Sequence, residues 1–295
     1  MTNWFYPAGT ASEGPWFLSV GAEGSSTQLD GWAHTGIKAA DVTEGQELML
    51  PAANEERLVV PLWGAFAVTT GGETHPLRGR ANVFAGPTDV CFIGNGQEIR
   101  ITATRPGRVA VATAPTAHRK PNRLFRAEDI AVELRGTGSC SREVHNFGMA
   151  ATLDADKFIV CEVITPAGNW SSYPPHKHDE ITETENALEE IYYFETAPAP
   201  GGAAQAQPIG YARVYSTDPA RPIDVHAEVR SGDSLFIPHG WHGPAAAAPG
   251  YHMYYLNVMA GPGQRHWLVT NDPCHSWIPE AMSSQSIDPR LPLTL

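Results

Sequence analysis

Cysteine is scarce in this sequence, with four residues among 295, and no two of them form a C-x-x-C pair. They are Cys91, Cys140, Cys161 and Cys274. The N-terminal segment also lacks the basic start and apolar core that are typical of an export signal. Scattered cysteines in a chain without such a signal indicate reduced thiols rather than a disulfide framework. We therefore expect a cytoplasmic protein.

Long hydrophobic runs are missing as well. The longest apolar stretches, such as residues 158–163, are far too short to span a bilayer. No long window shows the 3.6-residue apolar period of an amphipathic helix. The sequence therefore predicts neither membrane-spanning segments nor a helix-rich fold.

Positive charge is outnumbered, with 20 Lys and Arg against 32 Asp and Glu and a net charge of −12. Nucleic acids and membrane surfaces are themselves anionic, so this balance argues against both as partners. A small anionic substrate stays compatible with it, because a bound metal ion can reverse the sign of the field in one pocket.

Glycine and proline are abundant, with 28 and 25 residues. Both interrupt regular elements, which favours many short strands joined by turns. β-rich runs at roughly ten-residue spacing recur in residues 45–115 and again in 158–269, a pattern typical of a β-sandwich or barrel. Residues 114–146 have the character of a connector. We predict an all-β chain with two consecutive halves, residues 1–135 and 136–295.

The sharpest chemical signal is an H-x-H motif formed by His176 and His178. On an extended strand residues i and i+2 point to the same face, so the two imidazoles would lie side by side. Such a pair suits a divalent metal ion, although two surface histidines would explain the motif alone equally well. Downstream, Glu189 and Glu190 open an aromatic strand, and a turn–strand–turn segment ends at His242.

Together these segments resemble the two motifs of the cupin superfamily. There a glycine, an H-x-H and a glutamate that opens the next strand are followed by a G-x5-P-x-G segment and a further histidine. The matching residues are Gly168, His176, His178 and Glu190, then Gly232, Pro238, Gly240 and His242, with Asn257 on a following strand. The resemblance implies a bicupin, with two β-sandwich or jelly-roll barrels in one chain.

The resemblance also implies a metal site. Its ligands would be His176, His178, Glu190 and His242, holding one divalent ion (zinc, manganese, iron or nickel). Glu190 is preferred to Glu189 because the superfamily's ligand directly precedes the apolar strand residue, here Ile191. His239 competes with His242 for the fourth position. Lys177 alternates with the two histidine ligands and is expected to face away from the metal.

Two departures from the usual cupin spacing narrow the resemblance. Eleven residues separate the second histidine from the glutamate, more than cupins usually have, and the last histidine follows its motif more closely. The 5-deoxy-glucuronate isomerases of inositol breakdown have this form. Similar segments lie at residues 135–142, 168–179, 188–193, 249–261 and 271–278. The N-terminal half has no H-x-H and is expected to be a cupin without metal, with a structural or interface role.

The reaction implied by this resemblance is an aldose–ketose isomerisation of 5-deoxy-D-glucuronate to 5-dehydro-2-deoxy-D-gluconate. A metal ion would polarise the C1 and C2 oxygens, and a side chain would carry the proton. Tyr192, which shares strand parity with Glu190, and Tyr254 or Tyr255 are candidates for that side chain. Each would equally fit a packed aromatic residue with a satisfied hydroxyl. No nucleotide, flavin or pyridoxal cofactor is required.

The carboxylate of a sugar acid is best recognised by a guanidinium, whose planar fork pairs with both oxygens. Arg142 and Arg213 are the candidates, although each could be an ordinary surface arginine. Alternative functions are another metal cupin enzyme, such as a 4-deoxy-uronate isomerase or an iron dioxygenase, or a sugar-binding cupin. Pairing of sheet edges into a homodimer is a further expectation.

Overall fold

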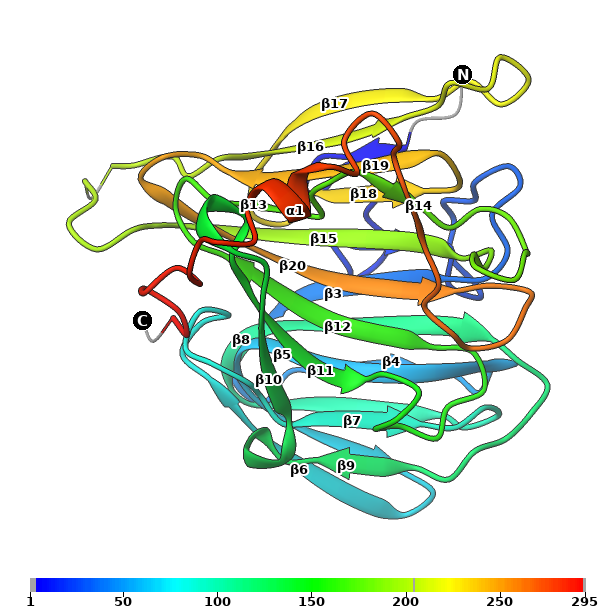
Figure 1. Cartoon of the computed structure of the whole chain (residues 1–295). Coiled ribbons are helices and arrows are strands. Elements are labelled where there is room, and N and C mark those ends of the chain that lie inside the picture. Colours follow the sequence, from blue (N-terminus) through cyan, green and yellow to red (C-terminus); the bar gives the residue numbers. More distant parts are fainter. Residues whose placement is uncertain (1–3, 204, 294–295) are drawn as a thin grey trace.

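The computed structural model describes residues 4–203 and 205–293 and is built almost entirely of strands. Three sheets are stacked in layers (Figure 1). The helical elements among the described residues are the 3-10 turns η1 (Ala127–Asp129) and η2 (Gly138–Cys140) and the short helix α1 (Ile278–Ala281). No helix in these ranges has the length and apolar character needed to cross a bilayer. The expected all-β class is confirmed.

The N-terminal half forms one eight-stranded sheet. Its strands are β2 (Leu18–Val20), β3 (Gly36–Val42), β4 (Glu47–Leu50), β5 (Glu55–Thr70), β6 (Glu73–Arg80), β7 (Val90–Ile93), β8 (Ile99–Pro115) and β9 (Arg123–Phe125). The long strands β5 and β8 pair along almost their whole length and enclose a core of their own, which includes Val59, Phe66 and Val111.

The other two sheets form the C-terminal half. The middle, seven-stranded sheet contains β1 (Phe5–Tyr6), β10 (Ala131–Arg135), β11 (Arg142–Gly148), β12 (Ile159–Thr165), β15 (Glu189–Pro198), β18 (Ser234–Ile237) and β20 (Tyr251–Ala260). The outer, six-stranded sheet contains β13 (Trp170–Ser171), β14 (His176–Lys177), β16 (Gly210–Tyr215), β17 (Asp224–Val229), β19 (Trp241–Ala247) and β21 (Thr270–Asn271). Strands β1 and β10 precede residue 136 but pair in the middle sheet; the domain boundary stays a prediction.

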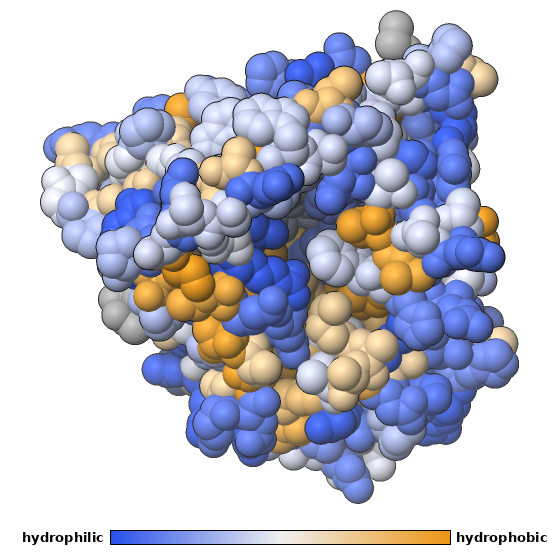
Figure 2. Space-filling model, in the orientation of Figure 1, coloured by the Kyte–Doolittle hydropathy of each residue, from blue (hydrophilic) through white to orange (hydrophobic). Residues whose placement is uncertain are grey.

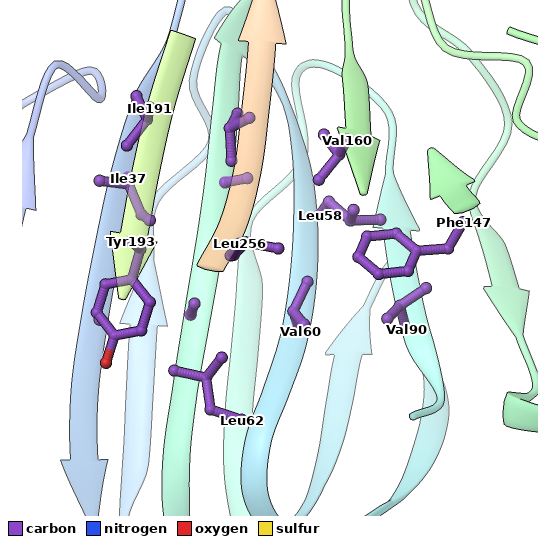
Figure 3. Close-up of a cluster of buried hydrophobic side chains, with 14 of the residues drawn as sticks. Ile37, Leu58, Val60, Leu62, Val90, Phe147, Val160, Ile191, Tyr193 and Leu256 are labelled. Carbon is purple, nitrogen blue, oxygen red and sulfur yellow. The ribbon is translucent and has the colours of Figure 1, made fainter. Parts of the chain in front are cut away.

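The middle sheet is buried on both faces, which explains why its strands have nearly continuous apolar sequences. On β15, Ile191 and Tyr193 pack against the N-terminal sheet in one core. Figure 3 shows these two side chains beside Ile37 of β3. Tyr192, with the opposite parity, belongs to the core shared with the outer sheet. Alternation along one strand therefore serves two cores.

The two halves repeat one strand order, β3-β8-β5-β7 in the first and β12-β20-β15-β18 in the second. The registers also correspond, because Arg57 of β5 lies opposite Ile93 of β7, as Glu190 of β15 lies opposite Ile237 of β18. One further strand extends each of these orders. The N-terminal strand β1 pairs with β18 in the second half, and β9, from the connector, pairs with β7 in the first. The two segments that flank the first half thus extend both sheets.

A buried ionic cluster joins the halves. The Arg80 guanidinium on β6 donates two hydrogen bonds of 2.7 Å to Glu162 on β12. The His145 ring bridges Glu162 and Glu143 at 2.6 and 2.7 Å, and the Tyr254 hydroxyl donates to Glu162 at 2.8 Å. Burial alone would raise the pKa of Glu162, but Arg80 and His145 lower it to about 2. The cluster therefore stays ionised and fully paired at neutral pH.

Arg80→Met should destabilise the protein strongly, because it leaves the buried Glu162 carboxylate short of its main counter-charge. We expect a loss of about 3–5 kcal/mol in the free energy of unfolding, measured by urea denaturation. The control is Arg100→Met, since Arg100 is half exposed and 3.8 Å from Glu47, and exposed pairs contribute less than about 1 kcal/mol. Equal stabilities of the two variants would contradict the role of the cluster.

Candidate metal centre

The four predicted ligands meet between the outer and the middle sheet. His176 on β14 lies directly opposite His242 on β19, and His178 follows β14 by one residue. The ligand nitrogens of the three histidines lie within 4.8 Å of one another. From β15, the Glu190 Oε2 atom approaches His178 Nε2 to 3.0 Å and His242 Nε2 to 2.8 Å. All four side chains are buried, so the structure brings the predicted set together.

The hydrogen bonds around the centre indicate that a cation belongs there. His178 Nδ1 lies 3.1 Å from the Leu188 carbonyl and His242 Nδ1 lies 3.2 Å from the Gly240 carbonyl. Because a carbonyl can only accept, each Nδ1 carries the proton, and in a neutral imidazole this leaves Nε2 with a lone pair. In that form both Nε2 atoms face Oε2 of Glu190, and the buried His242 Nε2 has no hydrogen-bond partner among the described residues. A divalent ion between these atoms would remove the conflict, so the residues fit a metal.

The electrostatics of two ligands, His176 and Glu190, agree with this donor set. At a third, His178, burial alone would lower the pKa, but the neighbouring Glu190 carboxylate raises it. Burial, together with His242 and His178, holds the pKa of His176 well below its ordinary value. Burial alone would raise the pKa of Glu190, but the neighbouring His242 and His178 lower it well below the usual range. Metal ligands must be deprotonated to bind. His176 and Glu190 are therefore prepared as a neutral imidazole and a carboxylate at neutral pH.

A pocket of about 130 Å³ opens beside the centre. His176 and Glu190 reach its wall. The other polar side chains that line it include Arg135, Arg142, Ser172, Tyr192, Tyr255 and Asn257. Figure 2 shows a hollowed, largely polar face of the molecule in the orientation of Figure 1.

The two pocket tyrosines share one serine. Ser172 Oγ lies 2.9 Å from the Tyr192 hydroxyl and 3.2 Å from the Tyr255 hydroxyl. Ser172 has a φ of 48°, which few residues other than glycine adopt. Burial raises the pKa of Tyr255 to about 12 and that of Tyr192 well above its ordinary value. Tyr254 faces the ionic cluster between the halves instead. The pocket hydroxyls thus keep their protons at neutral pH.

Arg142 is a half-buried cation without a counter-ion among the described residues. Its guanidinium donates a hydrogen bond of 3.2 Å to the Cys140 carbonyl. Within residues 4–203 and 205–293, no carboxylate lies at ion-pair distance from Arg142. Arg135, opposite it on β10, also lines the pocket but pairs with Glu133 at 2.8 Å. The sequence did not single out Arg135, although it begins one of the segments similar to the isomerases.

Arg213 lies elsewhere. It is exposed on β16, its guanidinium is over the Tyr215 ring at 4.6 Å, and it lines a different hollow from the metal centre. Its neighbours Ala212 and Val214 are the residues that face the core. Strand alternation therefore directs Arg213 away from the metal centre.

The alternatives weighed from the sequence also have definite places. Glu189 faces the N-terminal half and binds backbone amides there. His239 Nε2 contacts the Arg221 carbonyl at 3.0 Å, and Lys177 pairs with Asp179 at 2.7 Å. None of these three is in the histidine cluster that the described residues form.

Asn257 is a pocket residue that the sequence placed only as part of the second motif. It lies opposite Tyr192 in the β15–β20 ladder. It is 8% exposed, and its buried Oδ1 atom has no hydrogen-bond partner in the described part of the chain. A buried acceptor left unpaired costs roughly 1–3 kcal/mol, so such an atom at a pocket wall is suited to receive a ligand hydrogen bond.

Comparisons with known proteins agree with this geometry. The KduI/IolB family matches residues 6–278. A 5-deoxy-glucuronate isomerase of Halalkalibacterium halodurans is 40% identical over 250 residues, 84% of this chain and 88% of that protein. The 5-deoxy-glucuronate isomerase of Bacillus subtilis strain 168 is 39% identical over 247 residues, 83% of this chain and 87% of that protein.

Solved structures of similar fold include a member of the same group of proteins. An IolB-like protein from Salmonella typhimurium LT2 superposes with a TM-score of 0.82 at 32% identity, covering 93% of this chain and 98% of that chain. Oxalate decarboxylase from Bacillus subtilis, a cupin, gives a TM-score of 0.54 at 10% identity, covering 81% of this chain and 71% of that chain. This second likeness concerns the fold alone and confirms the expected bicupin. From its sequence and its fold, the chain belongs to the KduI/IolB family.

Proposed function

We propose that this protein is a 5-deoxy-glucuronate isomerase of inositol catabolism, which converts 5-deoxy-D-glucuronate to 5-dehydro-2-deoxy-D-gluconate. Relatives of about 40% identity over 84% of the chain carry that activity in their names. The structural observation that carries the proposal is one pocket lined by His176 and Glu190 of the cluster and by Arg142, which has no ion-pair partner among the described residues. An aldose acid needs both, a cation near its C1 and C2 oxygens and another for its carboxylate.

His176, His178, Glu190 and His242 would hold one divalent ion, whether zinc, manganese, iron or nickel. When bound, such an ion acts as a Lewis acid towards the carbonyl and hydroxyl oxygens of the substrate. Three neutral imidazoles and one carboxylate leave the site with a net positive charge, which attracts an anionic sugar acid. His176 and Glu190 of this donor set line the pocket.

Tyr192 and Tyr255 would act as hydrogen-bond donors, because their hydroxyl groups stay protonated. Because their pKa values are raised, neither is available as a phenolate base at neutral pH, and each keeps a hydroxyl proton that can be donated to a substrate oxygen that gains negative charge in the isomerisation. Ser172 bonds both hydroxyls and so fixes their orientation. Asn257 offers a free acceptor for a substrate hydroxyl on the same wall.

Arg142 would bind the substrate carboxylate. A desolvated guanidinium without a counter-ion gains most from a carboxylate that presents two oxygens. Arg135 adds positive charge at the same wall, although Glu133 already pairs with it. Fixing the far end of an open-chain sugar acid in this way positions its first two carbons towards the metal ligands.

All four cysteines are free thiols, which supports a reducing compartment such as the cytoplasm. The homodimer expected from the sequence stays a prediction.

Proton NMR of the metal-loaded protein with 5-deoxy-D-glucuronate in deuterated water, without oxygen, tests the reaction. We expect the signals of the 2-ketose acid to appear and to disappear when a chelator is added. Turnover without oxygen would separate an isomerase from an iron dioxygenase. Unchanged substrate with each of several divalent ions would contradict the proposal, and conversion of a 4-deoxy-uronate in its place would move it to the other isomerase.

His178→Ala should remove metal binding and turnover while the fold persists, because a central donor of the cluster is lost. The measurement is metal content after dialysis, together with the turnover rate. His239→Ala is the matched control, since His239 competed with His242 as a ligand in the sequence but contacts the Arg221 carbonyl in the structure. An active variant with a full complement of metal would exclude His178 as a ligand.

Arg142→Met should raise KM by roughly ten- to a hundredfold with little change in kcat, because a charge-assisted contact made equally in ground and transition state is removed. Steady-state kinetics measures both constants. Arg213→Met removes an exposed arginine outside the pocket and should leave both constants unchanged. If Arg213→Met raised KM and Arg142→Met did not, the assignment of the carboxylate site would be reversed.

A further inference from the structure

Glu189, next to the metal ligand Glu190, is held by the other half of the molecule. Its Oε1 atom accepts a hydrogen bond from the Ala33 amide at 2.6 Å. Its Oε2 atom accepts from the His34 amide at 2.7 Å and the Thr35 amide at 3.0 Å. The carboxylate is 8% exposed. Three successive backbone donors of the N-terminal half thus converge on a side chain of β15.

Glu56 makes the reverse arrangement. It belongs to β5 in the N-terminal half and accepts from the Lys157 and Phe158 amides through Oε1, at 2.7 and 2.8 Å, and from the Asp156 amide through Oε2 at 2.8 Å. Residues 33–35 lead into β3, and residues 156–158 lead into β12, the corresponding strand of the second half. The two carboxylates therefore form a reciprocal pair of clamps across the interface between the halves.

The strand registers confirm that the clamps occupy equivalent positions. Because Arg57 and Glu190 lie opposite corresponding residues, the residues before them, Glu56 and Glu189, also correspond. The residue after each clamp has different partners in the two halves. In the first half Arg57 bonds Glu55 at 2.9 Å and the Pro51 carbonyl at 2.7 Å, whereas in the second half Glu190 faces the histidines. Only the second clamp adjoins a metal ligand.

The position of Glu189 in the chain allows it to influence the position of Glu190. Glu189 and Glu190 are the first two residues of β15; in the loop before them residues 180–184 are exposed, whereas Glu185, Asn186 and Leu188 are buried. Strand ends of this kind open locally at little cost unless they are tied down. Alternation sends Glu189 to one face and Glu190 to the other, so a hold on the first fixes the backbone from which the second projects.

We propose that Glu189 is a positioning residue for the metal centre, through which residues 33–35 of the metal-free N-terminal half fix the ligand Glu190. The N-terminal half thereby contributes to the site without supplying a ligand. Outer residues that orient metal ligands typically change metal affinity by about ten- to a hundredfold when they are removed. This inference rests on the proposed metal site, but not on the identity of the sugar acid.

The test compares Glu189→Gln with Glu56→Gln in the full chain. Each substitution keeps the shape of the side chain and turns one carboxylate oxygen into an amide nitrogen that cannot accept from the backbone. The metal-free proteins are titrated calorimetrically with Mn²⁺ alone, without substrate. We expect Glu189→Gln to bind Mn²⁺ roughly ten- to a hundredfold more weakly than the parent. Glu56→Gln should keep the parent affinity although it loses comparable stability in urea.

A second readout is the visible absorption spectrum of the Co²⁺-loaded proteins, which should change in Glu189→Gln and stay as in the parent in Glu56→Gln. If Glu189→Gln does not fold, Glu189→Asp, which shortens the reach of the carboxylate, must show the same weakening. Unchanged affinity in the Glu189 variant, or equal weakening in both variants, would overturn the inference. A parent protein that binds neither ion would overturn the metal centre as well, whereas failure of turnover alone would concern only the substrate.

Discussion

The side chains of the middle sheet alternate between two buried faces, and the placing of the metal centre follows from that alternation. Ile191 and Tyr193 enter the core shared with the N-terminal sheet, while Glu190 and Tyr192 turn towards the outer sheet. A slip of one residue would exchange these sets, placing a carboxylate in an apolar core and isoleucine among the histidines. Since both faces are buried, a shift of one residue would leave side chains on both faces in incompatible environments.

The two faces of this sheet differ in whether their charged and polar side chains have partners. At the interface between the halves, Arg80 and Glu162 are paired with each other and the remaining carboxylate oxygens are bonded, so the cluster is complete. In the pocket, Arg142 and Asn257 lack such partners. Leaving polar groups unpaired costs stability, which a protein can tolerate where a ligand will pair with them. This contrast distinguishes the groups that stabilise the fold from the groups that are available to bind a substrate.

The sequence predicted best those features that depend on local periodicity. The H-x-H of His176 and His178 and the glutamate that opens the next strand needed only strand parity and motif spacing, and the structure brings them together. The all-β class followed from glycine, proline and short apolar runs. Distinguishing Tyr255 from Tyr254 required knowing which face of β20 meets the pocket, which no local pattern reveals.

Features that depend on long-range packing were beyond the sequence. Arg213 was a reasonable candidate until strand alternation placed it outside, and Arg135 entered the pocket only through pairing of β10 with β11. The pairing of β1 with β18 spans most of the chain and has no local signal. The same is true of Glu189, whose three partners lie more than 150 residues away.

Arg57 occupies the position in the first half that Glu190 occupies in the second. Its positive charge belongs to its own side chain and not to a bound ion. A guanidinium cannot dissociate, be exchanged for another ion or be withdrawn by a chelator. The electrostatic balance around Arg57 is thus independent of the metal supply. Around Glu190, the balance would vary with the binding of the proposed ion.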